Sequence, residues 1–452
     1  MNAITLRLLC RACIALAILC FLISVIQLLA NETTFTLTPN YEENQVHLDI
    51  VTGEHPDQIC EVQISDNLEI WTTVSEIELQ DGSGSTTIDN LSPSSGPVFY
   101  RVAFDDSTVE LVLDLPDALY NYANPPLPDH LTANNVQNED NTPDDNPVTD
   151  EGATLGRVLF YDKKLSLNET ISCSSCHLQE NGFSDPAQFS VGFEGGLTGR
   201  NSMGLANARF YEREHFFWDE RADTLEDQVL MPIQDAVEMG LTLDVLVERL
   251  QVQTYYQVLF AQAFGDEQVT SERISLALSQ FIRSMVSYRS KYDEGEQTNF
   301  ANFTAAENRG RQLFNSNQTR CNDCHEGVNF VGDQIENNGL EFPFLDLGVG
   351  GDTGRQQDMG KFKMSSLRNI EVTAPYMHDG RFATLEEVID HYSTEVVANP
   401  NLGNELEQPG PGDNPARPNF SPQATADLVA FLKTLTDHEF LTDPKFSDPF
   451  RE

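Results

Sequence analysis

Basic side chains are scarce in this sequence of 452 residues. Lys and Arg number 27 against 71 Asp and Glu, which gives a formal net charge of −44 at pH 7. A protein that binds nucleic acid needs a basic face to neutralise the phosphates. The composition therefore excludes nucleic acid as a partner, and it suits a strongly solvated protein or one that docks a basic partner.

The cysteines of a disulfide framework are also missing. The chain has eight cysteines, of which Cys10, Cys13 and Cys20 lie in the N-terminal segment. Cys60 stands alone, and we expect it to be a buried apolar side chain. The other four form two Cys-x-x-Cys pairs, so the usual disulfide interpretation of an exported chain does not apply.

A long apolar run lies within the first thirty residues. Arg7 and Arg11 precede an apolar stretch at 12–29 that only Ser24 and Gln27 interrupt. This pattern predicts that residues 1–30 are an export signal. The run is nearly long enough to span a bilayer, so an uncleaved membrane anchor is a second interpretation. Both place the rest of the chain in the periplasm or elsewhere outside the cytoplasm, with an inner-membrane tether if the segment is retained.

Residues 33–115 have the pattern of β-structure. Val46, Leu48 and Ile50 alternate with polar neighbours, and a hairpin turn is expected at 81–84. We expect a small β-sandwich with Trp71 in its core, and the segment resembles fibronectin-like modules. Residues 116–150 are rich in Pro, Asn and Asp, which indicates a linker or an irregular lead segment.

Beyond residue 150 a unit occurs twice, amid helical periodicity. The motif Asp219-x-Arg221-x-x-Thr224-Leu225-Glu226-Asp227 reappears as Asp379-x-Arg381-x-x-Thr384-Leu385-Glu386-Glu387, and Leu205-x-Asn207 reappears as Leu367-x-Asn369. The sequence therefore predicts a mostly α fold with two tandem domains of one kind, at 151–295 and 296–445.

Each of these domains contains one Cys-x-x-Cys-His motif. The two motifs are Cys173-Ser174-Ser175-Cys176-His177 and Cys321-Asn322-Asp323-Cys324-His325. In a c-type haem site both thiols bind the haem covalently and the adjacent His ligates the iron. Zinc binding and a redox dithiol are the alternatives, but two copies in an exported, repeated unit favour two covalently bound haems.

The two halves differ at the sixth position of the iron. Tyr392 lies on the same helical face as Leu385, Val388 and Ile389, so it is expected to point inward. Its counterpart in the repeat is Pro232, which has no side-chain ligand. One closed iron beside one open iron is the arrangement of an electron-transfer site next to a reaction site.

Other side chains of the second domain could compete with Tyr392 for its iron. These rivals are Met359, Met364, Met377, His378 and His391. Methionines at such spacing are more often core residues, and Tyr392 is the predicted ligand.

Three segments carry a resemblance to a known family. They are Phe217-Trp218-Asp219-x-Arg221-Ala222, Glu238-Met239-Gly240, and Leu367-Arg368-Asn369 followed by Thr373-Ala374-Pro375-Tyr376-Met377-His378-Asp379-Gly380. Over about residues 120–440 the chain resembles the bacterial di-haem cytochrome c peroxidase and MauG family.

The resemblance implies a role for each matching residue. His177 would be the proximal ligand of the peroxide-reactive haem, His325 that of the electron-transfer haem, and Trp218 a relay between them. Gln228 and Glu238 would line the distal pocket of the first haem. Glu238 has a physical rationale, because peroxide cleavage needs a group that moves a proton from one oxygen to the other; a solvated surface acid is its alternative.

The resemblance also implies an inter-haem calcium ion. Asn201, Thr373 and Pro375 match the family's calcium site, and their oxygens suit a hard cation.

Two departures favour the MauG branch. Phe193 stands where the peroxidase branch has a distal His, and Tyr392 stands where that branch closes the second haem with Met. Against this, Thr319 occupies the place of MauG's surface tryptophan.

The predicted function is therefore a di-haem peroxidase. It would reduce hydrogen peroxide at the first haem with electrons that a small redox protein or another donor delivers through the second haem. A MauG-like oxidation of a partner substrate is its variant. A pure electron-transfer di-haem cytochrome, with both irons closed, is the alternative from another class.

Overall fold

The computed structural model describes residues 112–408 and 414–451, together with the strands β1–β8 nearer the N-terminus. Contacts divide the chain into two compact units. The first comprises Met1–Leu115, Gln253–Ala261 and Arg451–Glu452, and the second comprises Pro116–Val252 and Gln262–Phe450.

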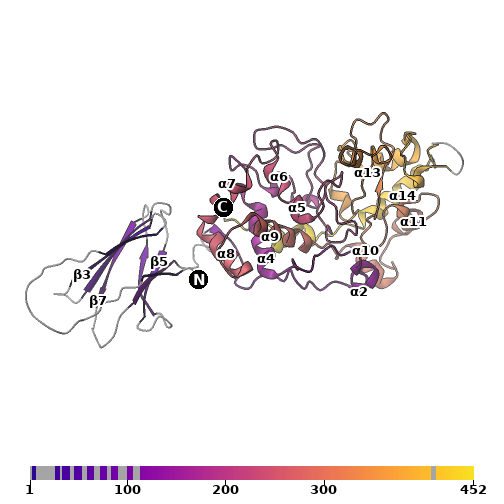
Figure 1. Ribbon diagram of the computed structural model, residues 1–452. Coiled ribbons are helices and arrows are strands. Elements are labelled where there is room, and N and C mark those ends of the chain that lie inside the picture. The colour runs from indigo at the N-terminus through magenta and orange to yellow at the C-terminus, as the bar shows by residue number, and fades with distance from the viewer. Residues whose placement is uncertain are drawn as a thin grey trace, which may run out of the picture. The chain divides into compact units, whose positions relative to one another are not determined.

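The N-terminal unit contains two four-stranded antiparallel sheets (Figure 1). One has the order β1 (Ala3–Leu6), β8 (Phe99–Phe104), β5 (Ile59–Ser65) and β6 (Thr72–Glu78), and the other β2 (Ile26–Ala30), β3 (Thr33–Asn40), β4 (Gln45–Thr52) and β7 (Ser83–Asp89). The alternating residues Val46, Leu48 and Ile50 lie on β4, as strand periodicity requires. The sandwich packing and the position of Trp71 fall outside the described residues and stay predictions.

The predicted export segment is described only in part. β1 and β2 lie within residues 1–30, whereas most of the apolar run at 12–29 falls outside the described residues. Among the described residues, no helix has the length and apolar character needed to cross a membrane.

The second unit is mostly helical, as the sequence predicts. The α-helices among the described residues are α2 (Asp129–Thr132), α3 (Asn134–Gln137), α4 (Asp150–Tyr161), α5 (Leu225–Gln228), α6 (Met231–Gln234), α7 (Leu243–Gln251), α8 (Thr254–Phe264), α9 (Ser271–Ser284), α10 (Lys291–Thr298), α11 (Ala305–Phe314), α12 (Val349–Thr353), α13 (Leu385–Asp390) and α14 (Pro422–Lys433). Most of α8 belongs to the first unit. The short strands β9 (Ile335–Glu336) and β10 (Phe362–Lys363) pair antiparallel. Long loops between the helices carry much of the unit.

The repeat appears as two matching helix pairs, α4 with α9 and α11 with α14 (Figure 1). A glycine stands at each crossing. In the first pair, a Cβ on Gly156 would overlap the carbonyl oxygen of Ala277 and lie 2.8 Å from Cβ of Phe281. In the second pair, a Cβ on Gly310 would overlap the carbonyl oxygen of Asp427 and lie 2.8 Å from Cβ of Phe431. The same close backbone approach thus builds both halves.

The segment at 116–150 packs along the helical unit. The Tyr122 hydroxyl donates to the carbonyl oxygen of Lys445 at 2.6 Å. Leu131 and Val136 are fully buried and form an apolar cluster with Phe210 and Val286. The lead segment is therefore irregular in its backbone but held by the core.

A buried ion cluster joins the lead segment to the second half. Asp293 accepts from His130 Nε2 at 2.8 Å and from Arg368 Nη1 at 2.7 Å. Arg368 also donates to the carbonyl oxygen of Val328. Each partner satisfies charge that would be costly to bury alone.

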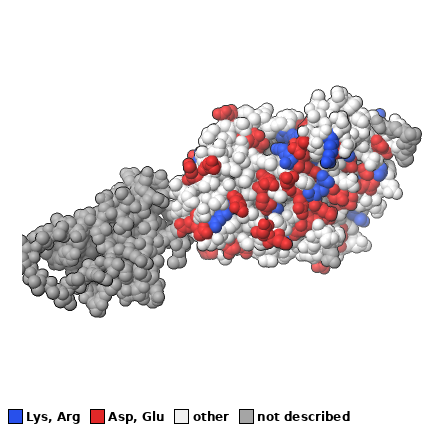
Figure 2. All heavy atoms as spheres, in the orientation of Figure 1, with Lys and Arg blue, Asp and Glu red and all other residues white. Residues whose placement is uncertain are grey.

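Acidic side chains are spread across the visible face of the helical unit, and the basic ones are fewer (Figure 2). On this face, therefore, acidic side chains predominate, in agreement with the negative net charge of the sequence.

Candidate haem sites

Two Cys-x-x-Cys-His motifs form the same tight turn at two places in the helical unit. The carbonyl oxygen of Cys173 accepts from the backbone N–H groups of Cys176, at 3.2 Å, and His177, at 3.0 Å. In the second motif the corresponding bonds to the carbonyl oxygen of Cys321 measure 3.3 and 3.0 Å. None of the four cysteines forms a disulfide, so all four thiols are available for covalent attachment.

The first motif opens into a cavity of about 570 Å³. His177 Nδ1 lies 2.7 Å from the carbonyl oxygen of Phe183, so this nitrogen donates and Nε2 keeps its lone pair. Burial lowers the pKa of His177, which favours the neutral ring that ligates iron.

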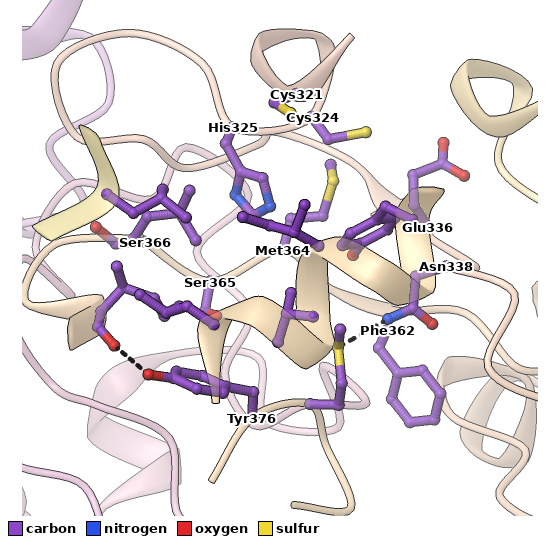
Figure 3. Close-up of a pocket in the computed structure, with 18 of the residues that line it drawn as sticks. Cys321, Cys324, His325, Glu336, Asn338, Phe362, Met364, Ser365, Ser366 and Tyr376 are labelled. Carbon is purple, nitrogen blue, oxygen red and sulfur yellow. Dashed lines mark hydrogen bonds between the residues drawn. The ribbon is translucent and has the colours of Figure 1, made fainter. Parts of the chain in front are cut away.

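The second motif opens into a cavity of about 280 Å³ with a mainly apolar lining (Figure 3). His325 Nδ1 lies 3.4 Å from the carbonyl oxygen of Phe330. Burial lowers the pKa of His325 to about 4, so this ring is also neutral. Each site thus offers two thiols, an oriented imidazole and an apolar cavity, which fits a covalently bound c-type haem.

Glu238, Gln228 and Pro232 line the first cavity together with the haem cysteines. Burial, and then the charge of Asp235, raise the pKa of Glu238, while Arg221 opposes them. The Glu238 carboxylate is close enough to Cys173 to affect the pKa of its thiol. The structure therefore brings Glu238 to the haem motif, as predicted from the resemblance.

Phe193 holds the loop that borders this cavity. Its backbone N–H donates to the carbonyl oxygen of Glu238 at 3.0 Å. A Cβ on Gly240, which has φ +66°, would lie 2.5 Å from two atoms of the Phe193 ring. The ring thus packs on Gly240 and, like Pro232, offers no iron ligand.

Trp218 lines both cavities. Its indole Nε1 donates to the carbonyl oxygen of Asn201 at 2.9 Å. The backbone N–H of Lys363 donates to the carbonyl oxygen of Trp218 at 2.8 Å. The structure thus holds Trp218 between the two motifs, as its predicted relay role requires.

Tyr392 faces the second cavity, together with Leu385, Val388 and Ile389. The inward face inferred from helical spacing is therefore correct, although α13 ends at Asp390 and Tyr392 lies in a π-helical turn at His391–Glu395. Such turns are frequent at functional sites. Burial, and then the Cys324 thiolate charge, raise the pKa of Tyr392, and a hydrogen bond with the side chain of Asn338 opposes them.

The rivals of Tyr392 separate into two groups. Met364, Met377 and His378 line the second cavity, whereas Met359 and His391 are not among the described residues that line it. Met364 packs on Gly332 next to the carbonyl oxygen of Cys324, on the side of the haem motif. His378 stacks on Phe362 with the ring centroids 3.8 Å apart.

The three residues of the predicted calcium site line the second cavity together. Asn201 Nδ2 donates to the carbonyl oxygens of Ala187, at 3.0 Å, and Gln188, at 3.3 Å. The side-chain oxygen Oδ1 is then the atom that could bind a cation. Thr373 and Pro375 add backbone oxygens, the ligand type that calcium prefers. Among the described residues, no cluster of three or more His, Cys, Asp or Glu could hold a metal ion.

Two residues that the sequence patterns did not reveal stand out around the cavities. Lys363 lines both of them, and its Nζ lies 3.3 Å from the ring centroid of Tyr211. Burial lowers the pKa of Lys363 to about 7. Asn338 lines the second cavity and contacts Tyr392 and Met377. No sequence signal marks either residue, because their partners lie far away in the chain.

A helical unit with two Cys-x-x-Cys-His cavities joined by one tryptophan defines a di-haem c-type cytochrome. Comparisons with known proteins agree with this class. Residues 150–299 match the family described as di-haem cytochrome c peroxidase. The methylamine utilization protein MauG of Methylophilus methylotrophus is 34% identical over 64% of this chain and 84% of its own length. Cytochrome c551 peroxidase of Nitrosomonas europaea is 31% identical over 64% and 81%.

Solved structures give the same result. A MauG-like protein associated with microbial copper homeostasis is 38% identical, with a TM-score of 0.63, over 72% of this chain and 99% of that protein. The diheme peroxidase BthA from Burkholderia thailandensis, at 22% identity and a TM-score of 0.56, shares the fold. The chain belongs to the di-haem cytochrome c peroxidase and MauG family, and it is a peroxidase-type oxidoreductase.

Proposed function

We propose that this protein reduces hydrogen peroxide at the first haem site with electrons that enter through the second. The main support is the difference between the two cavities. Pro232 and the acid Glu238 line the first, whereas the potential ligand Tyr392 lines the second. The bound haems would supply the iron that binds peroxide and the redox couple that carries electrons.

Glu238 is the residue that would move the proton. Peroxide cleavage takes a proton from one oxygen and returns it to the other, which becomes water. A carboxyl group with a raised pKa exchanges a proton more readily near neutral pH than an ordinary surface acid. Gln228 lines the same cavity and could orient peroxide through its amide.

Trp218 would connect the two sites. It contacts both cavities, and its side chain is fixed by the hydrogen bond to Asn201. The electron donor would be a small redox protein with a basic face, because the surface of the helical unit is acidic (Figure 2).

Within the family, the chain resembles the MauG branch in several respects. Tyr392 faces the second cavity, and Phe193 stands where the peroxidase branch has the distal histidine of the first. The MauG and MauG-like relatives, at 34% and 38% identity, support the same placement. Oxidation of a partner substrate is therefore the variant of the proposed function, and a pure electron-transfer role, which needs both irons closed, is not favoured.

We also propose a calcium ion at Asn201, Thr373 and Pro375. The Asn201 backbone carbonyl oxygen accepts from the Trp218 indole, and Asn201 lines the second cavity. A cation there would fix the relay tryptophan relative to both sites. We place the protein in the periplasm or another extracytoplasmic compartment, where c-type haem attachment and the predicted export segment agree.

Stopped-flow addition of peroxide to the diferric and the half-reduced protein tests the proposal. We expect two covalent haems per chain by pyridine haemochrome analysis, a high-spin component at the first site in at least one redox state, and a fast spectral change on mixing. A wholly low-spin protein that ignores peroxide in both states would instead be an electron-transfer cytochrome.

A further inference from the structure

Asn338 contacts three of the side chains that the sequence offers as ligands for the second iron. Its Nδ2 lies 3.2 Å from the sulfur of Met377 (Figure 3). Its side chain lines the same cavity as Tyr392 and is close enough to lower the pKa of the Tyr392 hydroxyl. Its backbone carbonyl oxygen lies 2.9 Å from His391 Nε2. One residue therefore engages the predicted ligand and two of its rivals.

These contacts have different consequences for the three side chains. Because a carbonyl oxygen only accepts, His391 Nε2 carries a proton in this contact and has no lone pair to give. Moving the Met377 sulfur to an iron would leave a partly buried Asn338 N–H without this partner, which costs free energy. A tyrosine oxygen can accept from Asn338 and still present a lone pair elsewhere.

The amide also favours oxygen over sulfur as a ligand. A hydrogen bond to an anionic oxygen is roughly twice as strong as one between neutral groups. Tyrosine binds iron as an anion, whereas a thioether stays neutral. The same N–H groups therefore stabilise Tyr392 in its ligating form more than they would stabilise Met377.

The segment that carries Asn338 is held in place. Asn337 Oδ1 accepts from the backbone N–H of Gly339 at 2.9 Å, and Asn337 Nδ2 donates to the carbonyl oxygen of Gly360 at 2.6 Å. The Val397 backbone N–H donates to the carbonyl oxygen of Gly339 at 2.8 Å. These bonds fix the Asn338 amide relative to the chain just after the π-helical turn.

We propose that Asn338 is a positioning residue that selects Tyr392, over Met377 and His391, as the side chain that closes the second haem site. This inference rests on the proposed role of Tyr392. It assigns the choice of ligand to a residue 54 positions away in the sequence, on the loop after β9.

The test compares near-infrared and electron paramagnetic resonance spectra, and the reduction potential of the second haem, in the wild-type protein and in Asn338→Leu. A haem iron with His and Met ligands gives a near-infrared absorption band, the His–Met band. We expect the wild type to lack this band. In Asn338→Leu the ratio of Met to Tyr ligation should rise by about tenfold, equivalent to about 1.4 kcal/mol, and the potential should shift upward. The double variant Asn338→Leu/Met377→Leu should lose the new band again.

Gln318→Leu is the matched control, since it removes an exposed amide from the same cavity and should leave spectra and potential unchanged. If Asn338→Leu fails to bind haem, Asn338→Asp keeps the size and shape; its carboxylate repels an anionic oxygen and should also favour Met377. A wild type that already shows the His–Met band would refute the Tyr392 proposal itself. A wild type without the band, with unchanged spectra in both Asn338 variants, would refute the selection by Asn338 alone.

Discussion

Burial of the Glu238 carboxyl group costs free energy of folding when the group is charged, and this cost suggests a functional role. Its pKa is raised by burial, so in the folded protein its charged form is disfavoured. An acid whose pKa is raised by folding destabilises the folded state. This destabilisation is absent below the unfolded pKa, grows as pH rises from the unfolded to the folded pKa, and is complete above the folded pKa. Glu238→Gln should therefore unfold no more easily than the wild type near neutral pH.

The same substitution should impair the chemistry. We expect Glu238→Gln to retain both haems and to react with peroxide about a hundredfold more slowly, the usual size of a general acid–base contribution. Stopped-flow rates measure this, with the exposed acid variant Asp244→Asn as the control. An unchanged rate would make Glu238 an ordinary surface acid.

Tyr392 carries the second residue-scale prediction. Tyr392→Phe should remove the sixth ligand and convert the second haem from low spin to high spin. Tyr392→Met should restore low spin with a higher potential, because a neutral sulfur stabilises the ferric state less than an anionic oxygen. Electron paramagnetic resonance and spectroelectrochemistry would detect both changes. A wild-type spectrum retained in Tyr392→Phe would make Tyr392 a core residue.

Residues that act through local motifs could be predicted from the sequence. The Cys-x-x-Cys-His turns depend on contacts across four residues, and the Thr384–Glu387 capping box that starts α13 is present as its spacing indicates. Asn338 and Lys363 could not be found in this way. Their roles depend on packing between loops, which no period or motif encodes.

The helix pairs α4–α9 and α11–α14 depend on one glycine each. A Cβ at Gly156 or Gly310 would overlap a backbone carbonyl of the facing helix, and backbone cannot move aside as a side chain can. Gly156→Ala and Gly310→Ala should each destabilise the protein by about 3 kcal/mol and reduce haem content in their own half. Denaturant titration and haem quantification measure both effects.

Gly199→Ala provides the control for this pair. A Cβ at Gly199 meets no atom within 4 Å, so its effect should stay within about 0.5 kcal/mol. Equal stability of Gly156→Ala and Gly199→Ala would contradict the close-packed crossing.

The π-helical turn after α13 could not be predicted from the sequence. Helical spacing gave the inward face of Tyr392, but it implied a regular helix through that residue. The structure widens the last turn instead. Ser393 accepts from the backbone N–H groups of Asn419, through its carbonyl oxygen, and Phe420, through its hydroxyl, so contacts from a distant segment accompany this turn.

At the scale of the whole molecule, Asp293 joins segments that are far apart in the chain. Burial alone would raise its pKa, but Arg368 and a hydrogen bond from His130 lower it to a net value below the usual range. Such a group contributes stability above its unfolded pKa of about 4, and this contribution is lost as pH falls through the folded pKa.

Asp293→Asn should therefore destabilise the protein at pH 7 by about 3 kcal/mol, since it leaves Arg368 buried without a counter-ion. Denaturation at pH 7 and in acid should show the difference narrowing as pH falls. Asp266→Asn, which alters an exposed pair with Arg273, should change little. A destabilisation that is the same at both pH values would contradict the charge-based explanation.

Trp218 gives the molecule an intrinsic optical reporter. The chain has two tryptophans, and this one lines both haem cavities. Haem absorbs where indole emits, so energy transfer over such short distances should leave Trp218 dark while either haem is in place. Emission from Trp218 would appear only when the helical unit opens, so a rise in indole fluorescence would report the loss of this unit.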